Sequence, residues 1–234
     1  MLIDMHAHTS GISHCCQTDG AGMLEAAARA GIDGVILTNH YPAFYVQQDG
    51  PEGLARRFAD EYYRTKTLAD ARGMRLFFGI EVTARHYADA HILLYGPPPE
   101  ALLQHPCVYD YTLEEMQQLV QPYGGLVIQA HPFRHGGHVI DHPAIDGLEI
   151  NCHPLYDDTH SDRLMDIARE KEWIITCGGD YHADTYRAVC GVHFPDDISD
   201  ITSLTKYLRT APVITMHIHE LRTEDHRDRQ FIRP

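Results

Sequence analysis

The sequence predicts an α/β fold with a parallel sheet in one domain, residues 1–234, and three observations support this prediction. Short apolar runs alternate with amphipathic stretches over about 210 residues. Most of the apolar runs are apolar throughout, as is typical of parallel strands buried on both faces. The chain length suits one large domain with a substantial core. The alternation alone leaves open whether the sheet closes into a barrel.

The nine apolar runs are the expected strands, at residues 2–6, 34–38, 75–82, 91–95, 125–130, 147–151, 173–177, 189–193 and 213–218. The amphipathic stretches between them are the expected helices, at residues 22–31, 52–73, 112–125, 160–172 and 198–210.

Local signals support the helix boundaries. The first two helices end at Gly31 and Gly73, and glycine is common where a helix stops. Thr112 and Glu115 form a capping box at the start of the third. The proline-rich stretch 96–106 predicts a surface loop, and the charged stretch 220–234 predicts a C-terminal strap or a partly disordered tail.

Composition excludes several classes of partner. The chain carries 33 acidic against 19 basic residues, a formal net charge of −14, which disfavours long nucleic acids. No apolar run is long enough to span a membrane. No secretory signal is visible, and the six cysteines lack CxxC spacing, so we expect reduced thiols in the cytoplasm. The oligomeric state cannot be predicted from these features.

Chemically active side chains recur at the ends of the predicted strands. They are His6, His8, His40, Glu81, His91, His131, Asp180 and His182. The carboxyl ends of parallel strands in a barrel form one face, where active sites assemble. Imidazole and carboxylate without cysteine is the ligand set of zinc, manganese or iron sites. Side chains alternate between the two faces of a strand, so His6 and His8, two residues apart, point the same way and can reach one cation. Glu81 and Asp180 would complete the ligands of that cation.

Six segments in order resemble one known family: "DMHAHTS", "GVILTNHY", "GIEVT", "AHILLYG", "QAHPF" and "GGDYHAD". On these segments the chain resembles the polymerase and histidinol phosphatase (PHP) family of metal-dependent phosphoesterases, from residue 2 to about residue 184. The resemblance implies a distorted, TIM-like barrel of seven β/α units, with a cluster of two or three divalent ions at the C-terminal ends of the strands. Zinc, manganese and iron all suit the ligand set.

The resemblance also assigns the ligands. It places His6, His8, Glu81 and Asp180 on the first metal. Glu81 would bridge to a second metal, held also by His91 and His131. A third would lie between His40, His182 and one further ligand, which is either His14 or Asp19, with His14 favoured. Asn39 stands where the family usually has aspartate, and we expect it to support His40 without binding metal.

The implied reaction is hydrolysis of a small phosphorylated substrate by a metal-activated hydroxide. His182, or the third metal beside it, would stabilise or protonate the leaving alkoxide. Arg134 is the best placed phosphate contact and Arg187 the second, because a guanidinium can bind two phosphate oxygens. His153 follows a strand end and would either line the pocket or support a ligand. Histidinol phosphate, a nucleotide and other small phosphomonoesters all remain open as substrates.

Three further functions compete with this interpretation. An amidohydrolase also begins with HxH, but many bridge their metals with a carboxylated lysine, and the three lysines here fall in predicted helices. A nucleotide phosphodiesterase and a non-catalytic metal-binding module are also compatible with the motifs. His217 and His219 repeat the HxH spacing on a late strand, where we expect no ligand role. The remaining loop or surface histidines include His86, His105, His135, His138, His142 and His160.

Overall fold

The structure is a computed structural model that describes residues 1–155, 158–184, 189–220 and 226–234. The helices are α1 (Gly20–Arg29), α2 (Gly50–Ala71), α3 (Pro99–Gln104), α4 (Leu113–Val120), α5 (Ser161–Lys171) and α6 (Ile201–Thr210). The strands are β1 (Leu2–Ala7), β2 (Gly34–Leu37), β3 (His40–Tyr41), β4 (Arg75–Ala84), β5 (Ala90–Tyr95), β6 (Leu126–Gln129), β7 (Gly147–Asn151), β8 (Ile174–Gly178), β9 (Gly191–His193), β10 (Val213–His219) and β11 (His226–Ile232).

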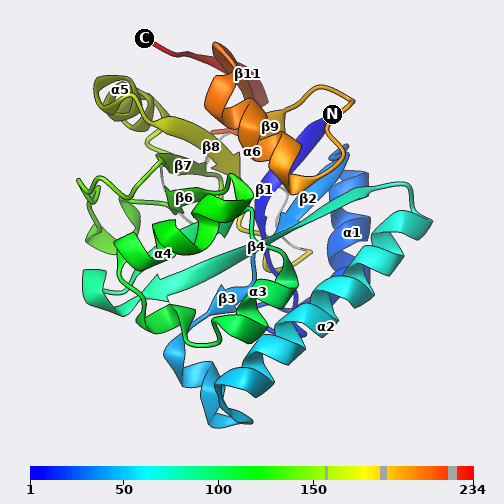
Figure 1. Cartoon of the computed structure of the whole chain (residues 1–234). Coiled ribbons are helices and arrows are strands. Elements are labelled where there is room, and N and C mark those ends of the chain that lie inside the picture. The colour runs from blue at the N-terminus through cyan, green and yellow to red at the C-terminus, as the bar shows by residue number, and fades with distance from the viewer. Residues whose placement is uncertain (156–157, 185–188, 221–225) are drawn as a thin grey trace.

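The sheet curls into a nearly closed barrel with helices packed around it (Figure 1). Within the described residues the barrel runs in the order β1, β2, β4, β5, β6, β7, β8, and a bridge between Ala7 and Tyr181 brings its two ends together. The short strand β3 continues past the end of β2 and pairs with β4, opposing His40 to Glu81. The predicted distorted, TIM-like barrel is therefore confirmed, with seven strands in its wall.

The expectation of a parallel sheet is wrong at β5, which runs antiparallel to both β4 and β6. Only residues 85–89 connect β4 to β5, and a parallel crossover needs a dozen or more residues. Ala88 and Asp89 close the connection with φ of 53° and 55°, a left-handed turn. This hairpin places His91 directly across the strand pair from Thr83, two residues beyond Glu81.

The C-terminal strands form an antiparallel extension that joins β1 through β9. β11 pairs along the length of β10 and buries Phe231 completely, so this part of the predicted tail is a structured strap. The predicted loop at 96–106 is wrong in part, because it contains α3. Proline at the start of a helix loses no hydrogen bond, and Pro99 and Leu102 are buried.

The two N-terminal helices lie side by side on one flank of the barrel (Figure 1). Asp19 precedes α1 and accepts a hydrogen bond from the Gly22 amide at 2.9 Å, which starts the helix earlier than predicted. Among the described residues, no helix is both long and apolar enough to cross a membrane.

Candidate metal centre

The predicted strand-end residues meet at one end of the barrel. β1 carries His6 and is followed by His8, β3 begins with His40, β4 carries Glu81 and β5 carries His91. His131 follows β6, while Asp180 and His182 follow β8. Four of these side chains are almost completely buried, namely His6, His8, Glu81 and Asp180. The other four keep some exposure, from 9% at His131 and 11% at His182 to 15% at His40 and 28% at His91.

The first cluster consists of His6, His8, Glu81 and Asp180. His6 Nε2 lies 3.0 Å from His8 Nε2, and His8 Nε2 lies 2.9 Å from Asp180 Oδ1. Both His6 and His8 lie 3.4 Å from a Glu81 oxygen. Bonds of about 2.1 Å hold neighbouring ligand atoms about 3.0–3.4 Å apart around one cation. The spacing therefore fits a shared metal ion.

Hydrogen bonds on the far side of each ring fix which nitrogen faces the cluster. His6 Nδ1 donates to Glu149 Oε1 at 2.8 Å. Ser13 Oγ donates to Asn39, so it accepts from His8 Nδ1 at 3.1 Å. In the neutral rings, each Nε2 atom then carries a lone pair directed at the other, an arrangement that a cation between them stabilises.

Glu81 is the centre of the second cluster, with His91 and His131. Its Oε1 lies 2.7 Å from His91 Nδ1 and 3.1 Å from His131 Nε2. Its Oε2 lies 2.5 Å from His40 Nδ1, yet among the described residues it accepts no hydrogen bond. Burial raises the pKa of Glu81, but His40, His91 and His6 together hold it well below the ordinary value. The ionised carboxylate thus faces imidazoles on both sides, as a metal bridge does.

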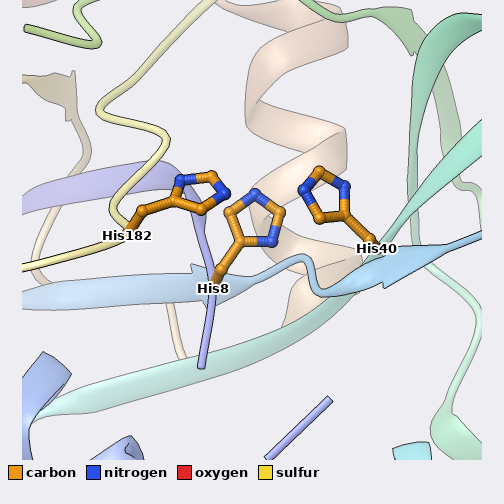
Figure 2. Close-up of side chains that lie close together, drawn as sticks. All are labelled: His8, His40 and His182. Atoms are coloured by element: carbon orange, nitrogen blue, oxygen red, sulfur yellow. The ribbon is translucent and has the colours of Figure 1, made fainter. Parts of the chain in front are cut away.

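The third cluster consists of His8, His40 and His182. The His8 ring lies between the other two (Figure 2), with centroids 4.2 Å from His40 and 4.3 Å from His182. His182 Nδ1 donates to the Asp180 carbonyl at 2.7 Å, and its Nε2 lies 3.2 Å from Cys15 Sγ. Burial raises the pKa of Cys15, but its hydrogen bonds to His182 and His40 outweigh this and lower it to about 6.

The two candidates for the further ligand occupy different places. His14 is exposed and its ring packs against Tyr45, with centroids 4.1 Å apart. It nevertheless lines a cavity of about 740 Å³ together with Cys15, His40 and His91. Asp19 is engaged in capping α1.

Several supporting residues were missed in the sequence. Glu149 on β7 binds His6 through Oε1, and its Oε2 accepts from the His131 amide at 3.2 Å. Asp4 accepts from the amides of His6 and Gly179 and is 5% exposed. Their signal was visible, because each is a carboxylate within an otherwise apolar strand segment.

Asn39 supports both His8 and His40 through Ser13. Its Oδ1 accepts from the Thr9 amide and from Ser13 Oγ, both at 2.8 Å. Ser13 in turn holds the His8 ring and accepts from the His40 amide at 3.0 Å. Asn39 therefore acts mainly through Ser13, and an amide side chain suffices for this role.

Arg134 forms an ion pair with Asp180, one of the candidate ligands. One guanidinium nitrogen donates to Asp180 Oδ2 at 2.6 Å and another to Asn151 Oδ1 at 2.7 Å. This holds the Asp180 carboxylate with Oδ1 towards His8. The side chain also lines a cavity of about 440 Å³ beside His131. Arg187 lies outside the described residues.

His153 is buried beside the third cluster, its ring centroid 5.6 Å from that of His182. Burial lowers its pKa to about 4, so the ring is neutral near pH 7. It lies close enough to Asp180 and His182 to share a cation with them. Both of the roles left open by the sequence remain compatible with this position.

Two of the predicted ligands have left-handed backbone conformations, His131 at φ 30° and Asp180 at φ 51°. Such conformations cost about 1–3 kcal/mol and tend to gather at functional sites. Each lies two residues beyond the end of a barrel strand, so the turn directs its side chain over the barrel end. By contrast, His217 of the second HxH pattern pairs with Asp228 of β11 at 2.7 Å.

Comparison with known proteins yields fold relatives only. No protein-family profile matches the chain, and no curated protein matches it. Among solved structures, a two-domain protein from Bacteroides vulgatus, containing a predicted PHP-like metal-dependent phosphoesterase, matches 94% of the chain with a TM-score of 0.67 and 16% identity. The chain spans 65% of the length of that protein.

Two further structures match with a TM-score of 0.57. PsfC from Pseudomonas syringae is 16% identical over 99% of this chain and 91% of its own. An amidohydrolase from Chromobacterium violaceum, with bound sulfate and no metal, is 15% identical over 89% of this chain and 97% of its own. The chain therefore shares the barrel fold of these proteins.

Proposed function

We propose that the protein is a metal-dependent phosphoesterase that hydrolyses a small phosphomonoester. The observation that carries the proposal is Glu81, a buried carboxylate with imidazoles against both of its oxygens. Its Oε1 lies near His6, His91 and His131, and its Oε2 lies near His8 and His40. Such an arrangement suits two cations about one bridging carboxylate.

The proposed ligands follow the three clusters. His6, His8, Glu81 and Asp180 would hold one cation, and Glu81, His91 and His131 a second. His40 and His182 would hold a third, with His14 or Asp19 as the further ligand that the sequence left open. Zinc, manganese and iron all suit the imidazole and carboxylate donors. Divalent cations bound there would supply electrophilic stabilisation of phosphoryl oxygens and a lowered pKa for the attacking water.

The protein's own residues would position and protonate the substrate. Arg134 fixes Asp180 and lines the adjoining cavity, from which its guanidinium would reach a phosphate oxygen. Burial lowers the pKa of His182, but Cys15 and Asp180 outweigh this and raise it. His182 would therefore carry a proton for the leaving alkoxide wherever it is not itself a ligand.

The cavities beside the centre suit a small substrate. Volumes of about 440 and 740 Å³ fall within the range of small-molecule sites. With the acidic net charge of −14, this supports a metabolite or nucleotide over a long nucleic acid. We place the enzyme in the cytoplasm within this proposal, since all six cysteines are free thiols.

An amidohydrolase is the second candidate, because a protein of that description shares the fold. A carboxylated lysine bridge has no support here. Lys66 on α2 pairs with Asp70, Lys171 on α5 pairs with Asp141 at 2.7 Å, and Lys206 is exposed on α6. Glu81 occupies the bridging place instead.

Phosphate release from a panel of small phosphomonoesters tests the proposal. The panel would include histidinol phosphate and mono- and bisphosphorylated nucleotides, with Mn²⁺, Zn²⁺ or Fe²⁺ returned to metal-stripped protein. We expect metal-dependent turnover that His6→Ala abolishes and that the matched variant His217→Ala retains. Hydrolysis of amide or lactone substrates but of no phosphoester would support the amidohydrolase, and metal binding without any turnover would support a non-catalytic module.

A further inference from the structure

We infer that the thiolate of Cys15 is a metal ligand, which completes a cation site with His40 and His182. The inference rests on the proposed metal centre and adds a soft sulfur donor to it. It replaces His14 and Asp19 as the further ligand of the third cluster.

Geometry places the sulfur in position to share a cation with the imidazoles. Cys15 Sγ lies 3.2 Å from His182 Nε2, and Cys15 lines the same cavity as His40, whose ring centroid lies 5.6 Å from that of His182. Bonds of about 2.3 Å to sulfur and 2.1 Å to nitrogen place the two donors about 3.2–3.6 Å apart. Because His182 Nδ1 donates to the Asp180 carbonyl, Nε2 is the ring nitrogen that faces the Cys15 sulfur.

The loop that carries Cys15 is tied to the metal centre on both sides. The Gln17 amide donates to the His182 carbonyl at 2.8 Å, and the Cys16 amide donates to the Ser13 carbonyl at 2.9 Å. Ser13 itself holds His8 through its hydroxyl. The position of Cys15 is therefore set by backbone contacts to the same segments that carry the other ligands.

The other candidates in this loop have different contacts. Cys16 is buried and its thiol donates to the carbonyls of His8 and Thr18, both at 3.4 Å, so it turns away from the cluster. The His14 ring packs on Tyr45, whose hydroxyl accepts from the His14 amide at 2.9 Å. Asp19 caps α1.

A thiolate changes which metals the centre prefers. Sulfur donors favour zinc over the harder manganese and magnesium ions, whereas imidazole and carboxylate alone accept zinc, manganese and iron alike. We therefore expect at least one cation to be zinc when metals compete, and we expect thiol reagents to displace it.

X-ray absorption on the zinc-loaded protein tests the inference, with Co²⁺ substitution as a second probe. We expect one sulfur scatterer per chain at about 2.3 Å and a thiolate-to-cobalt charge-transfer band in the wild type. Cys15→Ser should lose both signals and about one zinc per chain. Cys16→Ser and His14→Ala should keep both signals.

A labelling experiment on the unmodified protein avoids any folding defect of the variants. Iodoacetamide should alkylate Cys15 in metal-stripped protein and at least tenfold less in zinc-loaded protein, with Cys107 as the internal control. Bound zinc without a sulfur scatterer, a signal that survives Cys15→Ser, or equal labelling with and without zinc would overturn the inference.

Phosphate release by the same preparations separates the two proposals. Turnover without a sulfur signal would reject Cys15 as a ligand and leave the phosphoesterase standing. A sulfur signal lost in Cys15→Ser, with no turnover on any phosphoester, would establish the ligand and reject the proposed function.

Discussion

Glu149 binds no metal in our proposal, but it should still affect the affinity of the site for metal. The carboxylate accepts from His6 Nδ1 and from the His131 amide, so it orients two proposed ligands at once. Glu149→Gln keeps the volume but replaces one acceptor with a donor. We expect metal affinity or turnover to fall about 10- to 100-fold, as is usual for such partners of ligating histidines.

Metal titration and phosphate release measure this effect. Glu114→Gln is the matched control, because Glu114 also pairs with a histidine, His142 at 3.2 Å, but at the surface. Equal affinity in Glu149→Gln and the wild type would contradict the orienting role.

The protonation of Asp4 should make the stability of the metal-free protein depend on pH. Burial, only partly offset by amide hydrogen bonds, raises its pKa from 3.8 to about 7. The folded state then keeps a proton that the unfolded state releases near pH 4. The contribution of Asp4 to the free energy of unfolding is therefore fully present below about pH 4. It is lost as pH rises to about 7, and the total loss is roughly 4 kcal/mol.

Asp4→Asn removes this titration while its side-chain oxygen can still accept the amides of His6 and Gly179. In metal-stripped protein, the free energy of unfolding of the variant relative to wild type should therefore rise between pH 4 and pH 8. Urea denaturation at several pH values checks the sign, and a difference that stays constant with pH would refute it.

The sequence revealed the strand-end residues but not their supports, and the reason is distance along the chain. His6 and His8 could be paired from strand alternation alone. Glu149 lies 143 residues from His6, and only the closure of the barrel brings the two together. Cys15 was visible in the sequence, but nothing local indicated that its thiol would face His182.

At the scale of elements, connection length decided what the sequence could and could not predict. Apolar runs located the barrel strands to within one or two residues, because burial on both faces determines their composition. The direction of β5 was missed, since it depends on a five-residue connection and not on the strand itself. The helix α3 was missed because clustered prolines are typical of loops, although Pro99 stands where a helix accepts proline.

The strap β11 should stabilise the barrel without entering the metal centre. Phe231 is fully buried in the same core as Ile3, Met5 and Ile214. Phe231→Ala should lower the free energy of unfolding by about 3–5 kcal/mol, the usual range for a buried phenylalanine.

The neighbouring Ile232 is the matched control, since it is 60% exposed and its replacement by alanine should cost about 0.5 kcal/mol or less. Chemical denaturation measures both values, and metal stoichiometry should be unchanged in each variant. Loss of metal in Phe231→Ala under native conditions would contradict the separation of strap and centre.

At the scale of the whole molecule, the seven-strand barrel was predicted through family-like motifs and not through periodicity. Alternating strands and helices are common to open sheets and closed barrels, and closure depends on the approach of β1 to β8, which leaves no local pattern. The solved structures of similar fold are only 15–16% identical to this chain, so they support its fold alone. The reaction has to be inferred from the residues of the candidate site.

Metal binding should stabilise the whole barrel, because the proposed ligands come from most of its strands and are assembled only in the folded state. A cation that binds the folded chain alone adds about 2.7 kcal/mol when its concentration is 100 times its Kd. We therefore expect the Tm of the wild type to rise with Zn²⁺ or Mn²⁺ and to fall with a chelator. His8→Ala removes a residue shared by the first and third clusters, so most of this rise should disappear.

The metal-induced rise in Tm should also become smaller as the pH is lowered. Imidazole ligands must lose their protons before they bind a cation, so protons compete with the metal as pH falls from 8 to 6. Burial lowers the pKa of His6, but Glu149, Asp180 and Glu81 outweigh this and raise it well above 6.5, which keeps the proton in the metal-free protein. The metal-induced rise in Tm should therefore shrink steadily below pH 8. A rise that is independent of pH, or that persists in His8→Ala, would show that the cations bind elsewhere on the acidic surface.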